Sequence, residues 1–388
     1  MANTVFILGA GFSFDAGIPL LGRFIERMLL IAAERDKTTG KLSGNDRKLF
    51  DKALDIRDSM DGYHGRISFD DRNIEDILSM LAFSVMGTTG LRKPRANLDA
   101  FIQAISRTIE LTCAVKHPGP PIEKKSGFTI VDTGPAMYRR FWQALFKAYN
   151  TGMDFPCLIT FNYDLVLERS LFQVLINKIY NPSKNRCPFD SFHLNYSYKN
   201  SPNFYGAIEP CQYQLPEHSY VHGTKVIPKE VQGGKHLNID ILKLHGSLNF
   251  SRPITSEHNQ NPCEVVENPY ILPPISNKSA SPAGEEIWGR ALTELRNAKN
   301  VVFIGYSLPT TDIYMQFFIK AALGPNKGLE KVIVIDPVFN EPSQECEDMK
   351  VRYKNCFSEQ LRRRLSFSPI TAAKFVGELS KDPGAYIY

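Results

Sequence analysis

The stretch FILGAGFSFDAGIP, residues 6–19, places small residues directly after an apolar run. Gly9, Ala10 and Gly11 would permit a tight turn from a strand into a helix, with backbone N–H groups and the helix N-terminus facing a phosphate. An ordinary tight turn can carry the same Gly-x-Gly pattern, so both interpretations stay open on these residues alone. No acidic residue stands at the end of a second strand, where the dehydrogenase fingerprint requires one, and this disfavours hydride transfer.

Polar residues that could act on a hydroxyl group follow two other apolar runs: Asn162, Asp164 and His245. A neutral imidazole can take a hydroxyl proton near pH 7, and a carboxamide can orient a hydroxyl group or a water molecule. Each residue also has a structural alternative. Asn162 and Asp164 could cap a helix that begins near Leu165, and His245 could be a buried core histidine. A second His-Gly pair at His222 lies in an irregular region without the SLNF that follows His245, so we favour His245.

Five apolar runs, each ending in a polar residue or glycine, must position these groups. They are TVFIL, CLITF, IDILKL, VVFI and VIVI, and they are followed by Gly9, Asn162, His245, Gly305 and Asp336. Such runs are typical of parallel strands that helices cover on both faces, and ligands bind at the carboxyl ends of these strands. We therefore predict an α/β fold, a Rossmann-like doubly wound parallel sheet, in a single domain over residues 1–388.

Two segments depart from this alternation. Between about 23 and 150, apolar residues at helical spacing predict a large helical insertion. Two helical faces carry that pattern: Ile74, Ile77, Leu78 and Leu81, and Leu98, Phe101, Ile102 and Ile105. From about 181 to 236 the chain is rich in Asn, Pro, Tyr, Ser and Gly without a clear period, and we expect irregular, loop-rich structure there.

Composition sets the remaining bounds. The 388 residues carry a formal net charge of +5, which permits an anionic ligand without requiring nucleic acid. No apolar window is long enough to span a bilayer, and the start MANTVFILGAG has no basic leader, so we expect a cytoplasmic protein that binds no membrane. Seven scattered cysteines form no CxxC pair, and we expect no metal and no zinc module.

Two charged segments have simple structural interpretations. The basic stretch at 350–364 fits a solvated helix face, so direct nucleic-acid binding is not expected. The acidic stretch SFDDRNIEDIL could suggest a metal site. We prefer to interpret it as a capped helix start, because acids and Asn are favoured in the first turn of a helix. Its polar residues are Asp70, Asp71, Asn73, Glu75 and Asp76.

Four motifs, taken together and in order, resemble the sirtuin family of NAD-consuming proteins: GAGFSFDAGIP, TFNYD, LHGS and GYSL. The family has a Gly-Ala-Gly-x-Ser turn followed by Gly-Ile-Pro, then Thr-Gln-Asn-x-Asp, a His-Gly pair and Gly-x-Ser-Leu. The resemblance implies that NAD binds at the strand ends. It gives coenzyme-binding roles to Gly9, Ala10, Gly11, Ser13, Gly305, Ser307 and Asp336. It gives catalytic roles to Asn162, Asp164 and His245, with His245 as the base on the ribose hydroxyls.

The chain also departs from the protein-deacylating sirtuins. LLGR follows the Gly-Ile-Pro where they have Asp-Phe-Arg, Phe161 stands in the place of their Gln, and their two CxxC zinc pairs are absent from the sequence. What remains resembles the sirtuin-like domains of bacterial anti-phage systems, which hydrolyse NAD. That resemblance implies an NAD+ glycohydrolase that depletes NAD, forms a homo-oligomer and is regulated by a partner such as a helicase-like hexameric ATPase. The alternatives are an NAD-dependent protein deacylase and a non-catalytic nucleotide-binding sensor.

Overall fold

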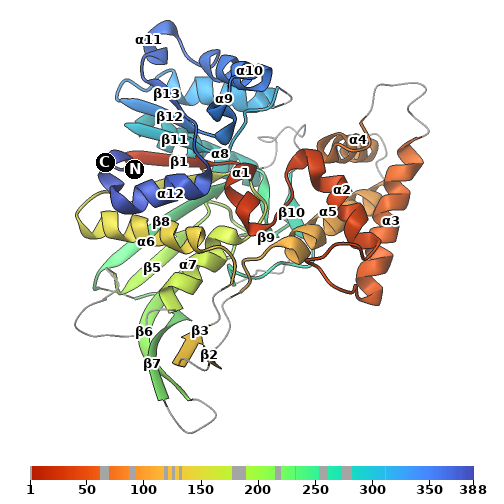
Figure 1. Cartoon of the computed structure of the whole chain (residues 1–388), viewed down its shortest axis with the longest axis horizontal. Helices are drawn as coiled ribbons and strands as arrows, with labels where there is room; N and C mark the ends of the chain where they lie inside the picture. Colours follow the sequence, from red (N-terminus) through yellow and green to blue (C-terminus); the bar gives the residue numbers. More distant parts are fainter. Residues whose placement is uncertain are drawn as a thin grey trace.

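The computed structural model describes residues 2–61, 70–86, 92–117, 121–124, 127–130, 133–176, 189–214, 220–231, 233–252, 261–272, 282–310 and 312–388. Its centre is a nine-stranded sheet in the order β13-β12-β11-β1-β4-β8-β5-β6-β7 (Figure 1). The strands are β1 (Thr4–Leu8), β4 (Cys157–Thr160), β5 (Ser191–Asn195), β6 (Phe204–Gln214), β7 (Tyr220–Pro228), β8 (His236–Lys243), β11 (Asn300–Ile304), β12 (Lys331–Ile335) and β13 (Leu365–Ser368).

The sheet is doubly wound around β1. Neighbouring strands from β13 to β5 run parallel, with β11 on one side of β1 and β4 on the other. All five apolar runs become adjacent parallel strands, so the predicted α/β, Rossmann-like class is confirmed. The chain order reverses at β1, and the carboxyl ends of the strands there form the crevice where open α/β sheets bind ligands.

Helices cover both faces of the sheet. Phe6 of β1 lies 6.0 Å, ring centre to ring centre, from Phe141 of α6 (Ala136–Asn150) and from Phe375 of α12 (Ala372–Lys381). Phe303 of β11 pairs with the next residue of β1 and so points to the other face, where its ring lies 5.1 Å from Tyr353 of α10 (Gln344–Lys354). The helices that pack on the sheet are α6 (Ala136–Asn150), α7 (Val166–Ile176), α8 (Pro282–Asn297), α9 (Ile313–Leu323), α10 (Gln344–Lys354) and α12 (Ala372–Lys381), and a short α11 (Glu359–Arg362) follows α10. None of the described helices has both the length and the apolar character needed to cross a membrane.

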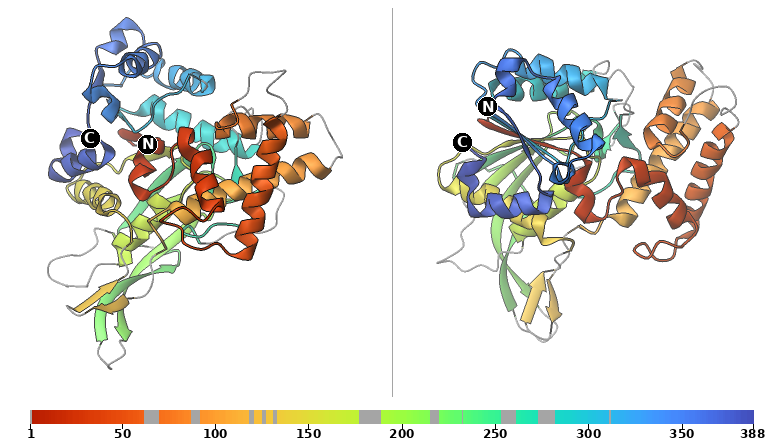
Figure 2. Two further views of the ribbon diagram at one scale, coloured as in Figure 1. Left: turned by 45° about the vertical axis from the view of Figure 1, so that its right-hand side comes forward. Right: turned by 45° about the horizontal axis from the view of Figure 1, so that its top comes forward.

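The predicted helices between residues 23 and 150 are present, and most of them form a group beside the sheet (Figures 1 and 2). This insertion consists of α2 (Phe24–Ala32), α3 (Gly44–Asp61), α4 (Ile74–Met86) and α5 (Arg92–Thr112). The short hairpin of β2 (Pro121–Lys124) and β3 (Gly127–Ile130) follows it along the chain. By contrast, α6 packs against α7 and α12 in the layer on the sheet, so the helical group ends near Thr112 rather than at 150. The predicted end was too late because an amphipathic pattern shows that one face of a helix is buried but does not show which element covers that face.

The expectation of irregular structure from 181 to 236 is wrong for most of the residues described there. Most of these residues form β5, β6, β7 and the start of β8. Residues 181–188, 215–219 and 232 lie outside the described part of the chain. β6 carries Gly206 and Pro210, which both disfavour strands. Antiparallel pairing with β7, from Gly206 opposite Pro228 to Gln214 opposite Tyr220, overrides these local preferences.

Glycine is required where the turns after β1 and β11 meet. Gly9 N donates to Ile304 O at 3.0 Å, and Gly11 N donates to Gly305 O at 2.9 Å. A Cβ atom on Gly9 would lie 2.4 Å from Gly305 O, and one on Gly305 would lie 2.7 Å from Gly11 Cα. The small residues of the opening motif therefore serve first to bring two strand ends into backbone contact.

We expect Gly305→Ala to lower the free energy of unfolding by about 2–5 kcal/mol. Gly305 has a φ of +60°, which is strained for alanine, and the new methyl group would overlap the backbone at Gly11. Gly289→Ala is the matched control, because Gly289 lies exposed within α8 and a Cβ atom there would meet no other atom within 4 Å. The control should gain about 0.5–1 kcal/mol from helix propensity. Urea unfolding of both variants measures the difference, and equal stabilities would contradict it.

Candidate functional site

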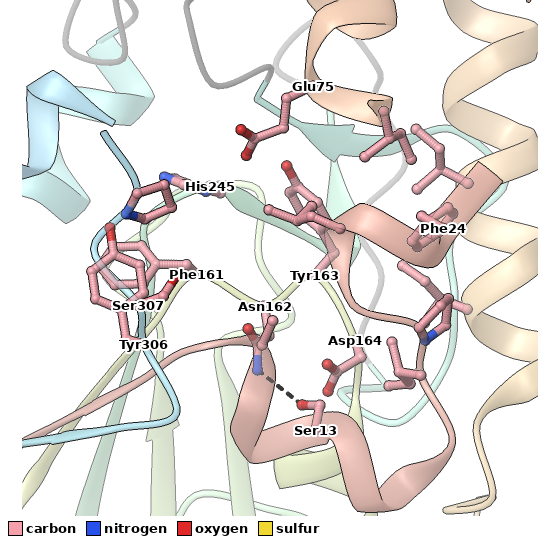
Figure 3. A pocket seen from close by; sticks show the side chains of 18 of the residues that line it. Ser13, Phe24, Glu75, Phe161, Asn162, Tyr163, Asp164, His245, Tyr306 and Ser307 are labelled. Carbon is pink, nitrogen blue, oxygen red and sulfur yellow. Dashed lines mark hydrogen bonds between the residues drawn. The ribbon is translucent and has the colours of Figure 1, made fainter. Parts of the chain in front are cut away.

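A pocket of about 130 Å³, partly open to solvent, lies between the carboxyl ends of the central strands and the insertion (Figure 3). Concave sites at this edge of an α/β sheet are typical places for small-molecule ligands. The strand ends contribute Ala10, Ser13, Phe161, Asn162, Tyr163, Asp164, His245, Gly305, Tyr306 and Ser307 to its walls. The insertion contributes Phe24, Ile74, Glu75, Leu78, Ile105 and Ile109.

Most of the predicted site residues meet in this pocket. Those that line it are Ala10, Ser13, Asn162, Asp164, His245, Gly305 and Ser307. Gly9, Gly11 and Asp336 are not among the lining residues that the structure describes. Asp336 follows β12, and its Oδ1 accepts a hydrogen bond of 2.9 Å from Val338 N at the start of a short 3-10 helix. Burial raises the pKa of Asp336, and its role toward adenosine ribose stays a prediction.

Asn162 is held by the glycine turn. Its Nδ2 donates to Gly9 O and to Ser13 Oγ, both at 2.9 Å (Figure 3). A carbonyl oxygen can only accept, so the contact with Gly9 fixes which end of the amide is nitrogen. Both Nδ2 hydrogens are thereby used, and Oδ1 is left as an acceptor at the pocket wall. The capping alternative is wrong for this residue.

Asp164 combines the two interpretations that the sequence left open. Its Oδ1 accepts a hydrogen bond of 3.0 Å from Val166 N, so it caps the start of α7 as an Asp is expected to do. Its side chain is also buried at the pocket wall. Capping therefore fixes the carboxylate in place beside the cavity.

His245 reaches the pocket from the turn between β8 and β9 (Gly246–Ser251). The residue is only 7% exposed, and its ring lies 5.1 Å from the ring of Phe161. Gly246 has a φ of +85°, and a Cβ atom there would lie 2.0 Å from Tyr270 O in β10 (Pro269–Ile271). The His-Gly pair thus has a physical reason, because only glycine permits the turn that directs His245 into the cavity. The competing His222 lies in β7, at the far edge of the sheet, and its side chain is outside the described part of the chain.

A buried ion pair that the sequence did not indicate lies behind the pocket. Lys243 Nζ lies 2.9 Å from Glu168 Oε1, and the two side chains are 1% and 0% exposed. Lys243 Nζ also donates to Asp164 O and, at 2.8 Å, to Ser247 Oγ, so its three hydrogens connect β8, β9 and the start of α7. Burial raises the pKa of Glu168, and the charge of Lys243 opposes this shift. The available signal was a lysine inside the apolar run IDILKL.

Two further pocket features were missed. Phe161 and Tyr306 form an aromatic wall with ring centres 4.5 Å apart, and Tyr306 Oη donates to Asp312 Oδ2 at 2.9 Å. Glu75, for which a role at the helix start was predicted, projects into the cavity from α4 (Figure 3). Its neighbour Asn73 makes the cap instead, because Asn73 Oδ1 accepts from Glu75 N at 2.9 Å.

The charges on the pocket wall are all negative. The lining residues that the structure describes include Glu75, Asp164 and Asp312 but no lysine or arginine. Nowhere in the described ranges do three or more His, Cys, Asp or Glu side chains gather closely enough to hold a metal ion. The electrostatics of the cavity therefore favour a ligand group that carries, or develops, positive charge.

No protein-family model and no curated protein matches this chain. Solved structures of Sir2 proteins align with nearly its whole length. A serine-to-alanine mutant of a Sir2 homologue in complex with ADP-ribose covers 97% of this chain and 90% of its own, at 12% identity and a TM-score of 0.30. A structure concerned with sirtuin substrate affinity covers 98% and 94%, at 12% identity and a TM-score of 0.32. Another, on the mechanism and regulation of Sir2 enzymes, covers 98% and 91%, at 12% identity and a TM-score of 0.31. Structural alignments with such low TM-scores carry no information about activity. The residues of the pocket are therefore the basis for the proposed reaction.

We expect Lys243→Met to lower the free energy of unfolding by about 3–5 kcal/mol, because it leaves the Glu168 carboxylate buried without its cation. A carboxyl group with a raised pKa in the folded chain binds its proton more tightly there, so its stabilising effect is present at low pH and lost as the pH rises. Removing Lys243 raises the pKa of Glu168 further. The loss of stability should therefore be greater at about pH 8 than at about pH 5.

Urea unfolding of Lys243→Met at the two pH values tests this expectation. The matched control is Lys350→Met, which removes a half-buried lysine at the protein surface that lies 2.8 Å from Glu347 within α10. A surface ion pair contributes little to stability, so the control should unfold as the wild type does at both pH values. A loss in Lys243→Met that is the same at both values would contradict the role given to Glu168.

Proposed function

We propose that this chain is an NAD+ glycohydrolase, which converts NAD+ and water to nicotinamide and ADP-ribose. The observation that supports this is the convergence of residues from four separate sirtuin-like motifs in one pocket at the point where the sheet reverses its order. Ser13, Asn162, His245 and Ser307 come from these motifs and line the same cavity.

The chemistry of the pocket fits cleavage of the nicotinamide–ribose bond. Breaking this bond develops positive charge on the sugar, which the negative walls of the cavity would stabilise. In this proposal the imidazole of His245 takes a proton from a ribose hydroxyl group, as a general base near neutral pH can do. Asn162 Oδ1, fixed by the glycine turn, accepts a hydrogen bond from a second hydroxyl group or from water.

We further propose that the enzyme acts as a regulated effector that depletes NAD in anti-phage defence, as a homo-oligomer under the control of a partner such as a helicase-like hexameric ATPase. An unregulated NAD hydrolase would drain a central coenzyme of its own cell. The insertion offers apolar surface for such contacts, because Leu29 and Leu30 of α2 are each 38% exposed and Phe83 of α4 is 59% exposed. Exposed apolar groups of this kind are common at interfaces.

Asn162→Ala and His245→Ala should each lower kcat for nicotinamide release by about 10²-fold or more, with the fold intact. Both side chains are proposed to act on the sugar while the bond breaks, so the loss should appear in kcat rather than in KM. Release of nicotinamide from NAD+, with and without an acetylated peptide, measures this and also separates hydrolysis from deacylation.

His222→Ala is the matched control for the histidine and should keep wild-type turnover. If His245→Ala keeps its turnover while His222→Ala loses it, the assigned base is wrong. Release that depends on the acetylated peptide would favour a deacylase, and binding of NAD+ without release would favour a sensor.

The isolated chain should have low activity that rises when the protein encoded by a neighbouring gene is added. We also expect a mass in solution that is a multiple of the chain mass of 43.8 kDa. Light scattering and NAD+ hydrolysis before and after the addition test the two expectations. A fully active monomer that no partner changes would overturn the regulation and leave the assigned site untouched.

A further inference from the structure

Glu75 enters the pocket from outside the sheet. It lies in the first turn of α4, and the backbone before it is fixed by Asn73, whose Oδ1 accepts from Glu75 N at 2.9 Å. Figure 3 shows its carboxylate pointing into the cavity above Asn162, between His245 and Tyr163. The next acid along the helix, Asp76, accepts from Asn73 Nδ2 at 3.3 Å and is not among the pocket-lining residues described. Glu75 therefore faces the site while its neighbour completes the helix start.

The negative charge of Glu75 reaches across the cavity. Burial raises the pKa of the Tyr163 phenol, and the charges of Glu75 and then Asp312 raise it further. Burial also raises the pKa of Tyr306 on another wall, where Asp312 adds to the shift and Glu75 contributes as well. One carboxylate thus acts on side chains from two strand ends.

The other two acids of the pocket have structural tasks at helix starts. Asp164 Oδ1 caps α7, and Asp312 accepts from Tyr306 Oη and from Met315 N at the start of α9. These hydrogen bonds hold the two carboxylates in place against the strand ends. Glu75 is the acid supplied by the insertion, on the wall opposite Asn162.

We propose that Glu75 is the catalytic base that takes the proton of the attacking water, an inference that rests on the proposed NAD+ glycohydrolase activity. The bond between nicotinamide N1 and ribose C1′ breaks, and its electron pair stays with nicotinamide, which leaves neutral. A bond forms between the water oxygen and C1′, and the water proton goes to the Glu75 carboxylate, which later releases it to solvent. The proton that His245 took from the ribose hydroxyl group returns to the ribose, so one proton is released for each NAD+ cleaved. Before the water attacks, the same carboxylate stabilises the positive charge on the sugar. The insertion is then part of the active site.

Glu75→Gln tests the charge with little change of shape. It should lower kcat for nicotinamide release by about 10²–10⁴-fold and change KM by less than about threefold, because the lost group acts after binding. Asp71→Asn is the matched control, because it removes one negative charge just before the same helix at a residue outside the described pocket lining, and it should keep wild-type turnover.

Azide rescue separates a chemical role from a structural one. Azide is an anion that needs no base, so added azide should restore turnover of Glu75→Ala by about tenfold or more and give an azide adduct of ADP-ribose, which mass spectrometry detects. Turnover of Glu75→Gln within about threefold of wild type, or a Glu75→Ala variant that azide leaves inactive, would overturn the inference. Wild-type protein that releases no nicotinamide even after the protein encoded by the neighbouring gene is added would instead overturn the proposed function itself, and the Glu75 step with it.

Discussion

The backbone contact between the turns after β1 and β11 is the constraint on which the rest of the site depends. Gly11 N donates to Gly305 O, and side chains at Gly9 or Gly305 would hold the two turns apart. Because the turns touch, Gly9 O is positioned to accept from Asn162, which in turn orients the amide. The N–H groups of Gly9 and Gly11 are already bonded within the protein, and α1 (Ala10–Ser13) has only four residues. The glycine motif therefore acts through packing and through the side chains it positions, and a pyrophosphate would have to be bound mainly by other donors.

Much of the fold could be predicted because parallel strands bring their carboxyl ends together. Each apolar run indicated a strand, and the residue after it indicated a position at one edge, where Asn162 and His245 both line the pocket. Lys243 and Glu168 could not be paired from the sequence, because their contact depends on how β8 packs against α7. Glu75 was missed for a related reason. An acid in the first turn of a helix is already explained by helix capping. Only the position of α4 across the pocket from the strand ends gives Glu75 a second role.

The buried ion pair shows how the pocket keeps its shape. A lysine surrounded by apolar side chains is costly unless all its hydrogens find acceptors. Lys243 meets this demand with Glu168, Ser247 and the backbone of Asp164. The same three contacts join the strand that precedes His245 to the loop that carries Asp164. The polar groups of the candidate site are thus held from behind by Lys243, Glu168 and Ser247, which are not among the lining residues that the structure describes.

The pocket has one wall from the strand ends and another from the helical insertion, and the two walls have different roles in the proposed reaction. The strand ends are bound to one another by sheet hydrogen bonds, glycine contacts and the ion pair, so Asn162, Asp164 and His245 belong to one rigid frame. Glu75 and the apolar wall of Ile74, Leu78 and Ile105 come from the helical insertion, whose buried side chains belong to the same hydrophobic core as those of the sheet. If Glu75 is the base, water attack requires α4 to keep its position across the pocket, whereas the proposed binding of a dinucleotide at the strand ends does not. A partner that shifts α4 relative to the sheet would then change turnover without altering any residue of the sirtuin-like motifs.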